Sequence, residues 1–163
     1  MRGFFSAVIF RFGAKMSFLC PTAWMGKCYD YKKERGSWMP YKHINLNPDK
    51  KRVGDCTIRA IAAATEKDWE SVYTSIALTG FCLHDMPSAN HVWGTYLRSI
   101  GWARYALPNS CPDCYTVEQF SKDFPHGTYI LALPSHVLCV KNGDWLDSWD
   151  SGEEMPLYYW QKG

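Results

Sequence analysis

The chain has 163 residues, of which 47% are hydrophobic and 16% aromatic, and its formal net charge is +2. This length suits one domain with a substantial core, and the composition excludes a disordered chain. The mild charge excludes the strongly basic surface of many nucleic-acid-binding proteins, so we expect no nucleic-acid partner. The seven cysteines are irregularly spaced, unlike those of a disulfide scaffold, which favours a reducing, cytoplasmic setting.

The first 40 residues are expected to form an irregular N-terminal arm, rich in aromatic residues, lysine, glycine and proline. An apolar run at residues 4–10 is at the short limit for an export signal and far too short to span a membrane, so we expect no membrane partner. Residues 1–15 are either unstructured or a mis-assigned start, with translation beginning at Met16. The folded domain is expected over residues 41–163.

Three helices are predicted in the first half of this domain, from apolar residues that recur at three- to four-residue spacing. The first helix begins with Asp55 as its N-cap and carries Cys56 in its first turn. The second covers residues 67–78 and is expected to stop at Gly80, and the third covers residues 89–100.

The second half of the domain changes from helical spacing to the two-residue period of strands. Thr116 and Gln119 form a capping box, and Asn142-Gly143 is typical of a two-residue hairpin turn. The expected elements are a short strand near residues 41–46, a helix from Thr116 to about Asp123, strands at 128–133, 136–141 and 144–147, and an edge strand at 155–160. The predicted fold class is therefore α+β, with N-terminal helices packed on a C-terminal antiparallel sheet.

Three side chains suggest thiol chemistry. Pairing around the hairpin turn places Leu138 opposite Asp147, so that His136 and Asp147 are diagonal neighbours on one side of the sheet. Cys56 lies at the positive end of a helix dipole, which favours its thiolate. A nucleophilic cysteine needs a neighbouring base, and the base needs an orienting group. Cys56, His136 and Asp147 therefore form a candidate catalytic set.

The segments around these residues resemble the papain-like cysteine peptidase superfamily, in particular small bacterial and phage-borne members related to the bacteriocin-leader peptidase domains of transporters. The resemblance covers residues 41–160, and its motifs lie at residues 54–60, 135–137 and 144–150. It implies a papain-like fold in which Cys56 is the nucleophile, His136 the general base and then acid, and Asp147 the orienting residue. Asp150 is the alternative for that last role.

The oxyanion donor is a point where the chain departs from this family. Members usually carry a glutamine several residues before the nucleophile, whereas this chain has no glutamine before Gln119. Asn47 or Asn45 is expected to replace it, because a side-chain amide can stabilise the developing oxyanion, with the backbone N–H of Cys56 as second donor. Trp149 is expected to shield the histidine and aspartate from water.

The leading hypothesis is a monomeric peptidase or amidase that needs no cofactor and acts on a peptide or protein substrate. Two alternatives remain open: a catalytically silent papain-like binding module, as in a phage or plasmid accessory protein, and an acyl transferase of transglutaminase-like type. Cys111 and Cys114 have the spacing of a zinc half-site, but a metal site needs two further ligands and no second pair exists. We therefore expect no metal.

Overall fold

Four helices and six strands make up the described part of the chain, residues 40–107 and 114–163 of a computed structural model. These residues belong to one unit, Met39–Gly163. The predicted N-terminal arm lies outside the described residues apart from Pro40. The elements are β1 (Tyr41–His43), α1 (Cys56–Thr65), α2 (Trp69–Leu83), α3 (Asn90–Ser99), β2 (Trp102–Ala106), α4 (Val117–Asp123), β3 (Thr128–Ala132), β4 (Val137–Lys141), β5 (Asp144–Asp147) and β6 (Tyr158–Lys162).

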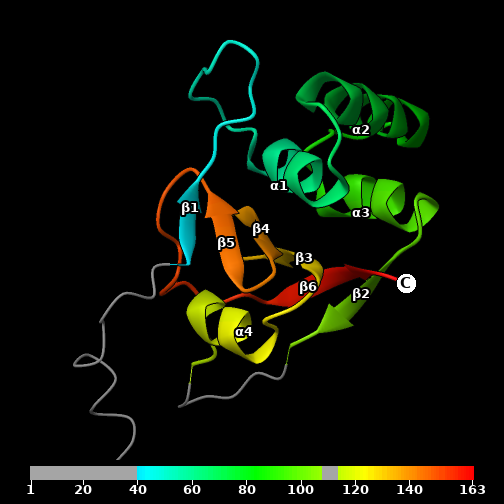
Figure 1. The fold of residues 1–163 in the computed structure, drawn as a ribbon. Coiled ribbons are helices and arrows are strands. Elements are labelled where there is room, and N and C mark those ends of the chain that lie inside the picture. The colour runs from blue at the N-terminus through cyan, green and yellow to red at the C-terminus, as the bar shows by residue number, and fades with distance from the viewer. Residues whose placement is uncertain (1–39, 108–113) are drawn as a thin grey trace, which may run out of the picture. The chain divides into compact units, whose positions relative to one another are not determined.

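The strands form one sheet in the order β1-β5-β4-β3-β6-β2 (Figure 1). β1 is parallel to β5, and every other neighbouring pair is antiparallel. The predicted α+β class is thus confirmed, with helices that are largely N-terminal. The expectation of a purely antiparallel C-terminal sheet is wrong, because β1 comes from before the helices and adds a parallel edge.

The hairpin of β4 and β5 has the predicted register. Cys139 pairs with Leu146, and Lys141 pairs with Asp144. Asn142 and Gly143 have φ angles of 52° and 81°, so both residues of the turn adopt the left-handed conformation that a type I′ turn requires. The side-chain oxygen of Asn142 also accepts a hydrogen bond from the Gly127 N–H, at 3.1 Å. This hydrogen bond ties the turn to Gly127, the residue just before β3.

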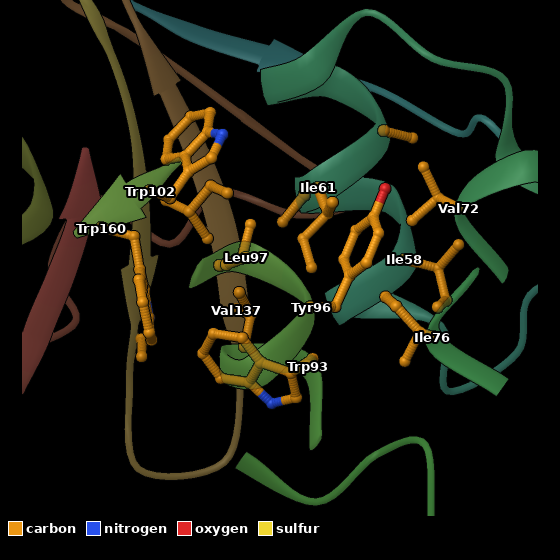
Figure 2. Close-up of a cluster of buried hydrophobic side chains, with 14 of the residues drawn as sticks. Ile58, Ile61, Val72, Ile76, Trp93, Tyr96, Leu97, Trp102, Val137 and Trp160 are labelled. Carbon is orange, nitrogen blue, oxygen red and sulfur yellow. The ribbon is translucent and has the colours of Figure 1, made fainter. Parts of the chain in front are cut away.

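Both faces of the sheet are covered, and the two-residue period of β3 shows how. Ile130 and Ala132 join the cluster under α1, α2 and α3, whereas Tyr129 and Leu131 join the cluster around α4 (Figures 1 and 2). The first cluster includes Ile58, Ile61, Val72, Ile76, Trp93, Tyr96, Leu97, Trp102, Val137 and Trp160. Burial on both faces explains why β3 and β4 have almost continuous apolar sequences.

The predicted helices are present, with one error in length. α2 runs to Leu83, beyond the predicted stop at Gly80. A Cβ at Gly80 would lie 2.6 Å from the backbone oxygen of Asp85, so this glycine permits the chain to fold back closely rather than ending the helix. The capping box of α4 is confirmed, because Thr116 and Gln119 exchange side-chain-to-backbone hydrogen bonds.

Two strand predictions are corrected by the sheet. β2 was not expected, and β6, expected at an edge over residues 155–160, runs over Tyr158–Lys162 between β3 and β2. The partners Trp102 and Lys162 are far apart in sequence, so no turn motif between them could have indicated the pairing. In the described ranges no helix combines the length and apolarity needed to cross a membrane.

Candidate active site

Cys56 is the first residue of α1, and it is half-buried. The first N–H groups of a helix have no partner within the helix, so the backbone around Cys56 presents donors and the positive end of the helix dipole. α1 packs on β4, which brings the thiol to the start of that strand. The Val137 backbone and the His136 side chain both form hydrogen bonds with the Cys56 sulfur.

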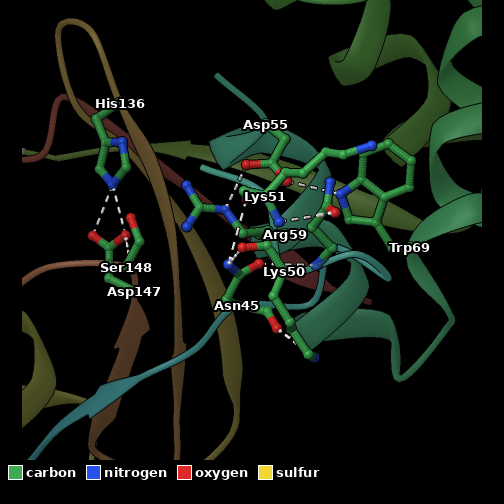
Figure 3. Close-up of polar contacts among 10 residues, drawn as sticks. Asn45, Lys50, Lys51, Asp55, Arg59, Trp69, His136, Asp147 and Ser148 are labelled. Atoms are coloured by element: carbon green, nitrogen blue, oxygen red, sulfur yellow. Dashed lines mark hydrogen bonds and ion pairs between the residues drawn. The ribbon is translucent and has the colours of Figure 1, made fainter. Parts of the chain in front are cut away.

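His136 lies in the tight turn between β3 and β4, and its imidazole is held by Asp147 at the end of β5. The His136 Nε2 atom lies 2.9 Å from Asp147 Oδ1 and 2.7 Å from Oδ2 (Figure 3). The backbone oxygen of His136 accepts a hydrogen bond from the Leu133 N–H at 2.8 Å, which fixes the turn. Because Asp147 occupies Nε2, the other ring nitrogen, Nδ1, is left for the thiol of Cys56.

Asp147 is held by more than the histidine. Its side chain accepts hydrogen bonds from the Ser148 N–H and from the Ser151 hydroxyl, each at 2.7 Å, and the residue is only 4% exposed. Its backbone oxygen accepts from the Ile44 N–H at 2.8 Å, next to β1. No sequence pattern identifies Ser151 as part of the site, because a serine in a polar loop looks like a surface residue.

The electrostatics of the pair favour an ionised thiol. Burial raises the pKa of the Cys56 thiol, but hydrogen bonds from His136 and from the Val137 backbone, with the charge of His136, outweigh burial and lower the pKa from 9.0. Burial lowers the pKa of His136, but hydrogen bonding to Asp147 and Cys56 raises it to about 9. The contact therefore favours the thiolate of Cys56 together with the imidazolium of His136, and the two groups titrate as a coupled pair.

This coupling predicts how the reactivity of Cys56 depends on pH. The rate of alkylation of Cys56 by iodoacetamide should rise with pH, and its midpoint should lie below the ordinary thiol value of 9.0, since the thiolate is the reacting form. The kcat/KM for an amide substrate should fall again near pH 9, where His136 loses its proton. Mass-spectrometric mapping of alkylated cysteines from pH 5 to 9 measures the rise in Cys56 alkylation. In His136→Ala the midpoint should move up towards the ordinary value, and an unchanged midpoint would show that the two groups are not paired.

A second prediction concerns Ser151, which is fully buried. Ser151→Ala removes one of the hydrogen bonds that hold Asp147, so unfolding free energy should fall by about 1 to 2 kcal/mol. Because a misoriented carboxylate supports the imidazole less well, kcat should fall by about tenfold. The alkaline fall in kcat/KM should also begin at a lower pH than in the wild type. Ser75→Ala, which removes an exposed hydroxyl on α2, is the matched control. A pH profile that stays at the wild-type position would leave Ser151 with a packing role alone.

Trp149 and Asp150 follow Asp147 closely in the sequence, and their side chains have different surroundings. The ring of Trp149 lies 5.4 Å from that of His136, tilted by 44°, and the residue is 43% exposed. Trp149 thus lies beside the imidazole, and its expected role in shielding the histidine and aspartate from water stays a prediction. Asp150 instead accepts hydrogen bonds from the Trp145 indole at 3.1 Å and from the Gly152 N–H at 3.2 Å. It stabilises the loop, and the carboxylate on His136 belongs to Asp147.

The two asparagines expected near the oxyanion lie in the loop before α1. The amide of Asn45 is used at both ends, since its nitrogen donates to the Lys50 carbonyl at 3.0 Å and its oxygen accepts from the Asn47 N–H at 3.1 Å. Asn47 is 6% exposed, and its side-chain oxygen accepts from the N–H groups of Asp49 and Lys51. Both residues therefore shape the loop that precedes the nucleophile.

Asp55 does not cap α1, contrary to the prediction. It occupies the N-cap position without a side-chain cap bond. Its Oδ1 atom forms an ion pair with Arg59 Nε at 2.8 Å, and its Oδ2 atom accepts a hydrogen bond from the Trp69 indole at 2.9 Å (Figure 3). The carboxylate is nearly buried and binds a charged partner, which outcompetes a neutral backbone donor. Asp55 therefore fixes α1 to the start of α2 beside Cys56.

The other cysteines give no second site within the described residues. Cys82 and Cys114 are exposed free thiols, and burial raises the pKa of Cys139 to about 12. Cys111, the other half of the candidate zinc pair, lies outside the described residues. Across residues 40–107 and 114–163, no group of three or more histidine, cysteine or acidic side chains is arranged to hold a metal ion.

Comparisons of the chain with models of protein families, with curated proteins and with solved structures gave no match. The assignment of a function therefore depends on the geometry of Cys56, His136 and Asp147.

Proposed function

We propose that this chain is a papain-like thiol hydrolase that cleaves a peptide, isopeptide or other amide bond through an acyl-enzyme. The observation that carries the proposal is the position of His136, whose Nε2 is hydrogen bonded to buried Asp147 while its side chain is hydrogen bonded to Cys56. This is the chain of contacts that thiol hydrolysis requires: nucleophile, proton carrier and orienting acid.

The reaction follows from these contacts. The Cys56 thiolate attacks the amide carbonyl, forming a sulfur–carbon bond and an oxyanion. The His136 imidazolium then donates its proton to the leaving nitrogen as the carbon–nitrogen bond breaks, which leaves a thioester on Cys56. In the second half, neutral His136 takes a proton from water, the hydroxide adds to the thioester, and Cys56 departs as thiolate. Asp147 keeps the ring oriented and stabilises its positive charge throughout.

For the oxyanion we assign the backbone N–H of Cys56 and the side-chain nitrogen of Asn47. The Cys56 N–H is among the first donors of α1 and has no helical partner at that position. The loop hydrogen bonds of Asn47 use its side-chain oxygen, so its nitrogen is the donor left to aim at substrate, whereas both ends of Asn45 are engaged. Asn47 thereby takes the place of the glutamine that is usual in the resembling family.

The described thiols are all free, which supports action in a reducing compartment such as the cytoplasm. The proposed enzyme is a monomer and acts on a peptide or protein substrate. The test is trapping of the acyl-enzyme: a mixture of fluorogenic peptide amides is added, the reaction is quenched with acid, and the mass added to each cysteine peptide is measured. Acylation confined to Cys56, together with release of the amine, supports the proposal.

The same experiment separates the alternatives. If Cys56 is neither alkylated nor acylated, the chain is a silent binding module that retains the arrangement without the chemistry. If the acyl group leaves Cys56 only when an amine acceptor is added, the activity is acyl transfer of the transglutaminase-like type. Release by water alone establishes hydrolysis.

A further inference from the structure

A cavity of about 260 Å³ lies beside the candidate active site. Two of its lining residues, Asp55 and Ser148, are the chain neighbours of Cys56 and Asp147, which places the cavity next to the segments that carry these two groups. The rest of its wall comes from β1, from the loop that leads into α1 and from Arg59 on α1. Figure 3 shows three of the lining residues, Asn45, Lys51 and Arg59, and Arg52 belongs to the same wall. Nothing in the proposed chemistry uses this cavity.

The charge of the cavity wall is positive. Lys51, Arg52 and Arg59 contribute three cations against the single carboxylate of Asp55, which leaves a formal charge of +2. Arg59 and Asp55 neutralise each other in an ion pair whose side chains are 11% and 6% exposed. The excess charge therefore belongs to Lys51 and Arg52, which are adjacent in the sequence and are both exposed.

These two cations are available to a ligand. Lys51 forms an ion pair with Asp49, but both side chains are about two-thirds exposed, at 65% and 67%, and such a pair contributes little free energy. Within the described residues, Arg52 has neither an ion pair nor a side-chain hydrogen bond. The Ser148 hydroxyl adds a neutral polar group to the same wall.

We propose that this cavity binds a carboxylate of the substrate close to the scissile amide, and that the enzyme is selective for acidic substrates. The inference rests on the proposed function, since it treats Cys56 as the nucleophile. A guanidinium and an ammonium in one concave site attract a carboxylate and disfavour a cationic side chain. The carboxylate can come from an aspartate or glutamate side chain next to the scissile bond or from a free C-terminus one residue beyond it.

The first test needs no substrate. N-ethylmaleimide and 3-maleimidopropionate react with thiols in the same way and differ chiefly by a carboxylate. The ratio of their rates at Cys56 (anionic over neutral) is measured by mass spectrometry in the full chain. In Arg52→Gln and Lys51→Gln this ratio should fall by about three- to tenfold per charge removed, and the wild-type ratio should fall as salt is raised from 20 to 500 mM.

Lys162→Gln is the matched control, since it removes one exposed charge from β6, which β3 separates from β4. Its ratio should equal that of the wild type. A ratio that Arg52→Gln and Lys51→Gln leave unchanged, at a Cys56 that reacts with both maleimides, would overturn the carboxylate site and leave the proposed function intact. A Cys56 that reacts with neither maleimide would overturn the proposed function itself.

The second test identifies the source of the carboxylate. Peptide amides are compared with glutamate or glutamine on either side of the scissile bond, and with a free or an amidated C-terminus. A preference for glutamate over glutamine that is lost in Arg52→Gln assigns the site to a side chain. A preference for the free C-terminus that is lost in the same variant assigns it to a chain end. Equal kcat/KM for charged and neutral peptides in the wild type would refute the selectivity.

Discussion

Replacement of Cys56 by alanine is expected to lower amide hydrolysis by about 10⁴-fold or more, because the covalent intermediate can no longer form. The free energy of unfolding should change by less than about 1 kcal/mol, since the side chain is small and only half-buried at the first position of α1. The measurements are turnover of an amide substrate and thermal or urea unfolding of the same preparation.

Cys82→Ala is the control for this experiment, because Cys82 is an exposed free thiol on α2. It should retain the wild-type rate and lose one alkylation site. A large loss of stability in Cys56→Ala with turnover preserved would identify Cys56 as a packing residue, and the function would have to be sought elsewhere.

Asp147→Ala is expected to damage both activity and stability. The Asp147 side chain accepts hydrogen bonds from His136, Ser148 and Ser151, so its removal leaves buried donors without an acceptor. We expect the free energy of unfolding to fall by about 3 kcal/mol and kcat to fall by about 10³- to 10⁴-fold. Asp144→Ala removes an acid from the same strand whose ion pair with Lys42 is partly exposed, and it should cost less than about 1 kcal/mol.

The stability of these variants should also depend on pH. Asp147 is the main source of the raised pKa of His136, so the pair stabilises the fold fully below pH 6.5 and loses this contribution as pH rises through about 9. The difference in unfolding free energy between wild type and Asp147→Ala should therefore narrow between pH 7 and pH 10. A difference that stays constant over this range would show that His136 is not the titrating partner.

Local patterns predicted the parts of the fold that local interactions determine. The capping box of Thr116 and Gln119 and the turn at Asn142-Gly143 each involve residues a few positions apart, and both are present as predicted. The hairpin turn also determined the register of β4 and β5, from which the approach of His136 to Asp147 followed. Short-range geometry was sufficient for these features.

Other features depend on packing that no short sequence pattern shows. Gly80 is predicted to end α2, but the helix continues to Leu83 and the chain reverses there, so that the Asp85 backbone oxygen lies 2.6 Å from where a Cβ at Gly80 would be. β6 was placed at an edge because its second partner, β2, has no turn motif linking it to β6. The position of Asp55 before α1 predicts a cap, but the indole of Trp69 reaches its carboxylate through the packing of α1 and α2, in addition to the local ion pair with Arg59.

The α+β class, the helical position of Cys56 and the pairing of His136 with Asp147 can all be predicted from the sequence, since each follows from a period, a cap or a tight turn. The support of Asp147 by Ser151, the shaping of the loop before α1 by Asn45 and Asn47, and the cationic cavity lined by Asp55 and Ser148 become visible in the folded molecule. Burial, desolvation and the sum of charges around a cavity arise from the packing of several elements, and no single segment encodes them.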